Sequence, residues 1–255
     1  MISCLMVTRP QRFELARLAI ADFAAQTHAP RELVVLHDGD AVFHAQLEAA
    51  AAGQAEVRIV RHAGGGSLGR LRNAAVEAAL GDYVCQWDDD DRYHPHRLAL
   101  QWQALHEANA DFCFLSDQLH WFAASGEMFW DDWNGEAYPM NVVQGTLLGR
   151  RDRMPAYPDR AREEDTGLLR AILRRGDSIA RLRHAGWCYV YVYHGGNVWD
   201  AAHHAAIRRA KALPQVTLLQ REAQLRRRLG EYRPGFGAVR FPHEAGHIAF
   251  AEAAG

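Results

Sequence analysis

Cysteine is scarce in this sequence, and no two cysteines have the C-x-x-C spacing of a zinc or redox site. The four that are present each stand alone in an apolar run: Cys4, Cys85, Cys113 and Cys188. We therefore expect buried free thiols in a reducing cytoplasm. No apolar run approaches the roughly 18 residues that a membrane-spanning helix needs, and no signal peptide precedes the first expected strand. These absences favour a cytoplasmic protein without disulfides.

Two common phosphate-binding fingerprints are also missing. The glycine-rich stretch at residues 64–69 is not followed by the Gly-Lys-Ser/Thr of a P-loop, and its glycine spacing is not that of a Rossmann fold. Residues 243–247 do match the H-E-x-x-H pattern of zinc proteases. A third ligand would have to come from the eight residues that follow, where Glu252 is the only candidate. Because Pro242 and Gly246 also disfavour a helix, we expect this match to be accidental.

The composition is that of a folded protein with an uneven charge distribution. With 255 residues, of which 49% are hydrophobic and 24% charged, the chain can bury a large core. The net charge is −2, yet residues 207–240 hold nine basic and two acidic residues. Two helical patterns separated by Pro214 follow residue 200. We expect a main domain over residues 1–200 and a basic amphipathic helical extension over residues 201–255.

Apolar strands alternate with helical patterns in the first part of the chain. Runs of strand length lie at residues 2–7, 33–36 and 57–60, and apolar residues recur at helical spacing between them, most clearly at residues 13–23. This alternation predicts βαβ units. The predicted fold class is therefore α/β, with a mainly parallel sheet flanked by helices.

Four consecutive acids, Asp88 to Asp91, follow an apolar strand at residues 83–87. Pro95 then stands where the first turn of a helix tolerates proline. Four carboxylates on one tight turn repel one another at neutral pH unless a cation binds there. Mg²⁺ or Mn²⁺ carrying substrate phosphates meets this requirement, and ligands of α/β sheets bind at the carboxyl ends of strands. The alternative is a solvated acidic turn.

Residues 83–98 resemble the strand, D-x-D signature and following helix of family-2 glycosyltransferases with the GT-A fold. Further matches occur in order over residues 1–200: a Thr after the first strand, an Asp-Gly pair after the second, and Arg-Asn after the glycine-rich stretch. The resemblance implies a nucleotide-binding sheet, with nucleotide contacts from Thr8, Asp38, Arg72, Asp88 and Asp89. From the residues alone, Asp38 could instead belong to a capping turn, and Arg72 could be a surface arginine of a helix.

The resemblance also implies metal-binding and catalytic residues. Asp90, Asp88 and His194 are the implied ligands of Mn²⁺ or Mg²⁺. Glu164-Asp165 resembles the Glu-Asp motif of inverting members, in which the Asp removes a proton from the acceptor hydroxyl. The same two acids could merely complement the positive end of a helix dipole, and a lone histidine could be structural.

Aromatic residues gather after the acidic turn, at Phe129, Trp130, Trp133 and Tyr138. They suit either a sugar ring or a protein core. Residues 121–130 have the pattern of a hairpin, and residues 142–148 are expected to form a strand beside the acceptor.

The resemblance implies a metal-dependent inverting glycosyltransferase that moves a sugar from a nucleotide-sugar, most often a UDP-sugar, to a saccharide or lipid-linked acceptor in polysaccharide or glycoconjugate biosynthesis. No nucleic acid is expected as a partner. The basic extension packs on the main domain or makes peripheral contact with the inner face of the membrane. A sugar-phosphate nucleotidyltransferase, whose glycine signature is missing after Thr8, and a non-catalytic carbohydrate-binding protein are the alternatives.

Overall fold

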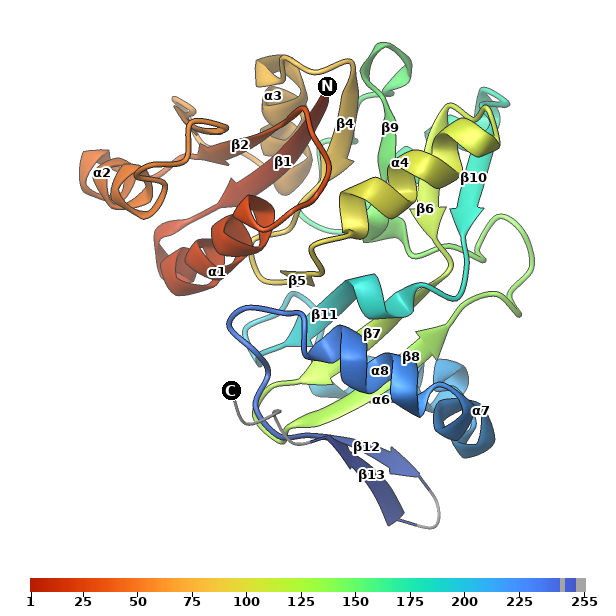
Figure 1. Ribbon diagram of the computed structural model, residues 1–255. Coiled ribbons are helices and arrows are strands. Elements are labelled where there is room, and N and C mark those ends of the chain that lie inside the picture. Colours follow the sequence, from red (N-terminus) through yellow and green to blue (C-terminus); the bar gives the residue numbers. More distant parts are fainter. Residues whose placement is uncertain (244–245, 251–255) are drawn as a thin grey trace.

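The computed structural model describes residues 1–243 and 246–250, and it contains two β-sheets, the larger above the smaller in Figure 1. The strands of the larger sheet are β1 (Ile2–Thr8), β2 (Arg31–His37), β3 (Val57–Arg61), β4 (Tyr83–Gln86), β6 (Phe112–Leu115), β9 (Leu148–Arg150) and β10 (Ile179–Leu182). Their spatial order is β10-β6-β9-β4-β1-β2-β3, and only β9 runs antiparallel to its neighbours. The predicted mainly parallel α/β sheet is therefore confirmed.

Helices cover both faces of this sheet. The helices α1 (Phe13–Ala24), α2 (Ala41–Ala50) and α4 (Arg97–Glu107) contribute to one buried apolar cluster, while α3 (Leu68–Ala78) and α5 (Glu164–Arg174) contribute to another. Along β1, Cys4 and Met6 belong to the first cluster and Leu5 to the second, because successive side chains of a strand point to opposite faces. All four cysteines are buried and free, as expected.

The strand order reverses beside β1. The chain adds β2 and β3 on one side of β1 and then crosses to place β4 on the other side. Ligands of open α/β sheets bind outside the carboxyl ends of the strands at such a reversal. The acidic turn follows β4 directly, so it lies at this position.

The smaller sheet combines the middle of the chain with its C-terminal part. Its strands are β5 (Arg92–Tyr93), β7 (Asp117–Phe122), β8 (Glu127–Asp132), β11 (Tyr189–Tyr193), β12 (Val239–His243) and β13 (Gly246–Phe250), in the order β13-β12-β8-β7-β11-β5. The pair β7 and β8 is the hairpin expected near residues 121–130. His243 ends one strand and Gly246 begins the antiparallel partner strand, so the H-E-x-x-H match does not lie on a helix; Glu244 and Ala245 are outside the described residues.

The strand expected at residues 142–148 is wrong for most of its length. The backbone forms a 3-10 helix over Gln144–Thr146, and β9 starts only at Leu148. The Thr146 hydroxyl donates to the carbonyl of Val143 over 2.6 Å and accepts from the amide of Leu115 over 2.9 Å. Such side-chain bonds to the backbone compete with a strand ladder.

The C-terminal part begins with three helices, α6 (Ala201–Lys211), α7 (Gln215–Gln220) and α8 (Glu222–Leu229). Their buried residues Leu218, Leu225 and Leu229 belong to the same apolar cluster as residues of β1 and α1. The domain boundary at residue 200 stays a prediction. Within the described residues, no helix combines the length and the apolar character needed to cross a membrane.

Replacing Leu225 by alanine tests whether α8 is part of the core. Leu225 is fully buried, whereas Leu219 on α7 is 49% exposed. We expect Leu225→Ala to lower the free energy of unfolding by about 2–5 kcal/mol, and Leu219→Ala to change it by less than about 0.5 kcal/mol. Equal effects in urea denaturation would show that α8 does not pack as described.

Candidate active site

Asp88, the first acid of the turn, is held by two side chains. Arg72 donates from Nη2 to Asp88 Oδ1 over 2.7 Å, and Gln86 donates from Nε2 to Oδ2 over 3.0 Å. Arg72 is only 7% exposed and also donates from Nε to Glu164 Oε1 over 3.0 Å. Burial lowers the pKa of Arg72, but the charges of Asp88 and Glu164 outweigh it and raise the pKa well above its ordinary value. Arg72 is therefore a permanent buried cation between two acids.

Asp89 and Asp90 share a second arginine. Arg12 Nη1 lies 2.9 Å from Asp89 Oδ1 and 2.8 Å from Asp90 Oδ2. His194 Nε2 also lies 3.3 Å from Asp90 Oδ2. Burial and the charge of Asp90 raise the pKa of Asp89 to about 7. Burial alone would raise the pKa of Asp90 too, but His194 and Arg12 outweigh it and lower the pKa.

Asp91 faces away from these cations into the protein. It is 3% exposed, accepts a hydrogen bond from the Tyr189 hydroxyl, and accepts another from the amide of Val192 over 3.0 Å. Burial raises the pKa of Asp91 well above its ordinary value. Asp91 therefore anchors the turn to β11, the strand that leads to His194.

A cavity of about 300 Å³ opens beside the acidic turn, at the reversal of the strand order. It is lined by Val7, Thr8, Arg9, Arg12, Asp38, Gly66, Ser67, Leu68, Leu71, Asp89, Ala161 and Val198. Thr8 and Asp89 are both buried there, and a hydrogen bond between their side chains opposes the rise in the pKa of Asp89. With these two polar groups in its wall, the cavity has the size and lining of a small-molecule site.

The glycine-rich stretch forms one wall of the cavity. Gly64, Gly65 and Gly66 all have positive φ angles, of 112°, 57° and 152°, which side chains other than glycine rarely adopt. Ser67 then caps α3 by accepting from the amide of Arg70. A Cβ on Gly69 would lie 1.9 Å from the carbonyl oxygen of Pro158, so α3 can approach the segment before α5 only through a glycine.

Glu164 and Asp165 stand in the first turn of α5. Glu163, in the left-handed region with φ of 57°, precedes them. Glu164 is 5% exposed and pairs with Arg72, while Asp165 Oδ1 accepts from the amide of Thr166 over 2.7 Å. Burial raises the pKa of Asp165, although the charge of Arg72 acts in the opposite direction. A carboxylate whose pKa is shifted towards neutrality is better suited to accept a proton.

The structure brings most of the predicted residues together in two groups, one at the cavity and one between the acidic turn and α5. Thr8, Asp38 and Asp89 line the cavity, and Asp90 meets His194 beside it. Arg72 does not line this cavity; it joins the acidic turn to α5. Arg12 was not predicted as a site residue, because nothing in the sequence near residue 12 indicates that it forms ion pairs with Asp89 and Asp90.

Only two of the expected metal ligands face each other. Asp90 and His194 are in contact, whereas both oxygens of Asp88 accept hydrogen bonds from Arg72 and Gln86. No group of three or more His, Cys, Asp or Glu side chains in residues 1–243 and 246–250 is arranged to hold a metal ion. A carboxylate and an imidazole fit a divalent cation that takes its remaining ligands from water and substrate phosphates, but they do not form a closed cage.

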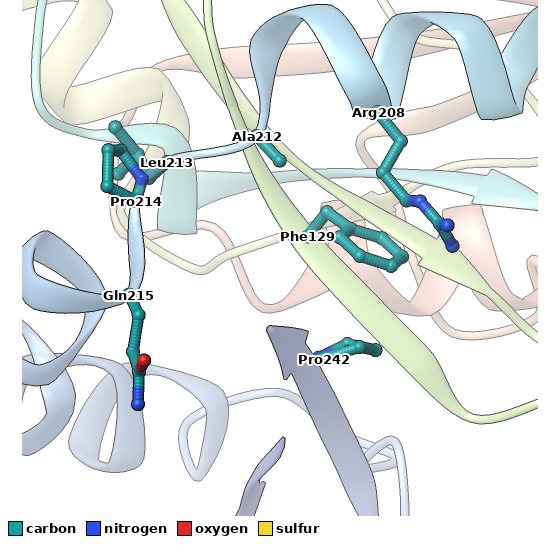
Figure 2. Close-up of a pocket in the computed structure, with 7 residues that line it drawn as sticks. All are labelled: Phe129, Arg208, Ala212, Leu213, Pro214, Gln215 and Pro242. Atoms are coloured by element: carbon teal, nitrogen blue, oxygen red, sulfur yellow. The ribbon is translucent and has the colours of Figure 1, made fainter. Parts of the chain in front are cut away.

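Figure 2 shows a second cavity, of about 540 Å³, where the connection between α6 and α7 meets the smaller sheet. It is lined by Phe129, Arg208, Ala212, Leu213, Pro214, Gln215 and Pro242, and by none of the predicted site residues. The Arg208 guanidinium lies 4.7 Å from the centre of the Phe129 ring. Trp130, the next residue, is fully buried and donates to Asp117 over 2.9 Å. Trp130 therefore belongs to the core, whereas Phe129 lines this second cavity.

Comparisons with known proteins bear on the family and the fold of the chain. The sequence model of the family described as Glycosyl transferase family 2 matches residues 5–139. Among solved structures, S. aureus TarS residues 1–349 in complex with UDP superposes with a TM-score of 0.58 at 15% identity, over 91% of this chain and 79% of that one. The same segment in complex with UDP-GlcNAc gives 0.56 at 14% identity, over 91% and 80%. No curated protein sequence matches the chain.

Replacing Arg72 by glutamine tests its place between the half-buried Asp88 and the buried Glu164. Removal of one partner leaves the other charges buried and uncompensated, so we expect Arg72→Gln to lower the free energy of unfolding by about 3–5 kcal/mol. Arg70→Gln is the matched control, because Arg70 is exposed on the same helix, and we expect a change below about 0.5 kcal/mol. Similar urea midpoints for Arg72→Gln and the unmodified protein would contradict the buried bridge.

Proposed function

Because the chain belongs to glycosyl transferase family 2, we propose that it moves a sugar from a nucleotide-sugar donor to an acceptor hydroxyl with inversion at the anomeric carbon. The chain is a glycosyltransferase, which excludes the nucleotidyltransferase and the non-catalytic binding protein. The observation that carries the proposal is the cavity at the strand reversal, where Thr8, Asp38 and Asp89 gather beside Asp90 and His194.

The donor is proposed to be a UDP-sugar. In this arrangement Asp38 accepts a hydrogen bond from the base. Asp38 lines the cavity and follows β2, which is two strands away from β4 and its acidic turn. The buried Thr8 hydroxyl and the Asp89 carboxylate face the rest of the nucleotide. The UDP and UDP-GlcNAc found with TarS, which shares the fold, support this choice of donor.

Asp90 and His194 are the residues proposed to hold Mn²⁺ or Mg²⁺. The bound cation would neutralise the charge of the departing nucleoside diphosphate. Asp88, also expected as a ligand and nucleotide contact, is assigned instead to positioning Arg72, because its two oxygens already accept hydrogen bonds. Arg72 in turn is assigned to joining Asp88 and Glu164.

Asp165 is proposed as the general base. The oxygen of the acceptor hydroxyl bonds to the anomeric carbon while the proton of that hydroxyl passes to the Asp165 carboxylate. The bond between the anomeric carbon and the diphosphate breaks, and the diphosphate leaves with the electron pair. Attack from the face opposite the leaving group gives inversion. Glu164 is assigned to holding Arg72, which keeps the first turn of α5 next to the acidic turn.

The acceptor is proposed to be a saccharide or a lipid-linked saccharide, reached from the cytoplasmic side of the membrane. Peripheral membrane contact through the basic extension is supported by the exposed side chains of Val216 and Leu219, which are 63% and 49% exposed, together with the exposed Arg209 and Arg227. Exposed apolar and basic side chains in one helical segment suit an acidic lipid surface.

The metal assignment predicts the behaviour of Asp90→Asn. In the unmodified protein, UDP should raise the melting temperature more with Mn²⁺ than without it, because a ligand of the native state stabilises that state. We expect Asp90→Asn to lose the Mn²⁺-dependent part and His194→Ala to lose less of it. Asp82→Asn, at a carboxylate whose side chain is 80% exposed, is the control. An unchanged Mn²⁺ effect in Asp90→Asn would place the cation elsewhere.

The base assignment predicts the behaviour of Asp165→Asn. The amide is nearly isosteric but cannot accept the proton, so transfer from the UDP-sugar should fall by roughly 10²–10⁴-fold, while UDP affinity measured by calorimetry stays the same. Glu163→Gln is the matched control, since Glu163 is exposed next to the same helix, and it should transfer at the normal rate. If Asp165→Asn also transfers normally, Asp165 only complements the helix dipole.

A further inference from the structure

Arg12 occupies an unusual position between the acidic turn and the candidate donor cavity. It ends the 3-10 helix η1 (Pro10–Arg12) that follows β1, and its Nη1 lies within 2.9 Å of oxygens of both Asp89 and Asp90. Its side chain is 17% exposed, and it lines the cavity. One guanidinium thus neutralises two acids of the turn and also borders the space in which a diphosphate would lie.

The oxygen that Arg12 contacts is the one that also faces His194. Asp90 Oδ2 lies 2.8 Å from Arg12 Nη1 and 3.3 Å from His194 Nε2. A divalent cation held by Asp90 and His194 would compete with the guanidinium for this oxygen, because two cations at one carboxylate oxygen repel each other. Arg12 must then leave Asp90 or weaken binding of the cation.

The cavity offers Arg12 another anionic partner. Guanidinium groups bind phosphate oxygens through two parallel hydrogen bonds, and Arg12 already lines the wall that it would share with a diphosphate. Movement from Asp90 to a phosphate would keep the charge of Arg12 paired in both states. The acidic turn would then be neutralised by its own arginine before the donor binds and by the divalent cation afterwards.

We propose that Arg12 is a resident counter-cation of the acidic turn: it competes with the divalent cation for Asp90 when the site has no donor, and it binds the diphosphate of the donor once displaced. This inference rests on the proposed function of the cavity. Arg12 then has two opposite effects. It weakens binding of the divalent cation in the absence of nucleotide, and it strengthens binding of the nucleotide in the absence of the cation.

The test measures the two affinities separately on the full chain. Mn²⁺ binding without nucleotide is followed by the loss of the electron paramagnetic resonance signal of free Mn²⁺, and UDP binding is measured by calorimetry in EDTA. We expect Arg12→Gln to bind Mn²⁺ roughly tenfold more tightly and UDP at least roughly tenfold more weakly, the size of a lost charged hydrogen bond. Arg12→Lys keeps a charge with a shorter reach and should shift both affinities in the same directions by less.

Two control variants separate this effect from general electrostatics. Arg9 lines the same cavity and has no ion pair with Asp89 or Asp90 in the described residues, so Arg9→Gln should leave Mn²⁺ affinity unchanged. Arg17 pairs with Glu14 on the surface of α1, and Arg17→Gln should change neither affinity. If Arg9→Gln tightened Mn²⁺ binding as much as Arg12→Gln, the effect would be one of net charge and the proposal would be wrong.

Failure of this inference can be told apart from failure of the proposed function. If the unmodified protein binds neither UDP nor UDP with Mn²⁺, the donor site itself is wrong. If it binds both but Arg12→Gln and Arg12→Lys leave Mn²⁺ affinity unchanged or weaker, Arg12 is only a structural counter-ion. Circular dichroism of both variants verifies the fold, and a folded Arg12→Lys decides the question if Arg12→Gln does not fold.

Discussion

Three of the four consecutive acids at the end of β4 can stay together because two arginines from distant parts of the chain neutralise them. Arg72 on α3 pairs with Asp88, and Arg12 after β1 pairs with Asp89 and Asp90. Without these cations, the repulsion within one tight turn would oppose folding. The positions of η1 and α3 relative to β4 are therefore constrained by charge as well as by packing.

The same charge pairing connects the acidic turn to α5, the helix that carries the proposed base. Arg72 contacts Asp88 and Glu164 at once, and Gly69 lets α3 approach the backbone of Pro158, just before α5. The first turn of α5 is thus fixed to the acidic turn through buried contacts. Proton transfer to a general base requires that the base be held in a fixed position, and a rigid, hydrogen-bonded neighbour provides this.

Two arginines of the C-terminal part pack against aromatic side chains. Arg221 lies over the Trp130 ring at 4.5 Å, and Arg228 lies over the Trp187 ring at 4.1 Å. Their aliphatic stems and guanidinium groups cover buried aromatic residues. A stretch that reads as a solvated basic face therefore supplies part of the packing of the protein core, while Arg209 and Arg227 stay exposed.

The sequence by itself determined the features that depend on neighbouring residues. The alternation of strands and helices, the Ser67 cap and the hairpin of β7 and β8 all follow from local periodicity and turn chemistry. The pairing of Asp90 with His194 was also anticipated, but through family resemblance rather than through physics. Local pattern failed at residues 142–148, where Thr146 bonds to Val143 and Leu115 instead of leaving the backbone free for a strand.

Only the tertiary structure decided which charges meet. Arg12 and Asp89 are 77 residues apart in the chain, and Arg72 and Glu164 are 92 apart. An arginine in a helical pattern looks the same whether it faces solvent or a buried carboxylate, because its partner is chosen by the packing of elements that are distant in sequence. The residues of the acidic turn could therefore be identified from the sequence, but the cations that neutralise them could not.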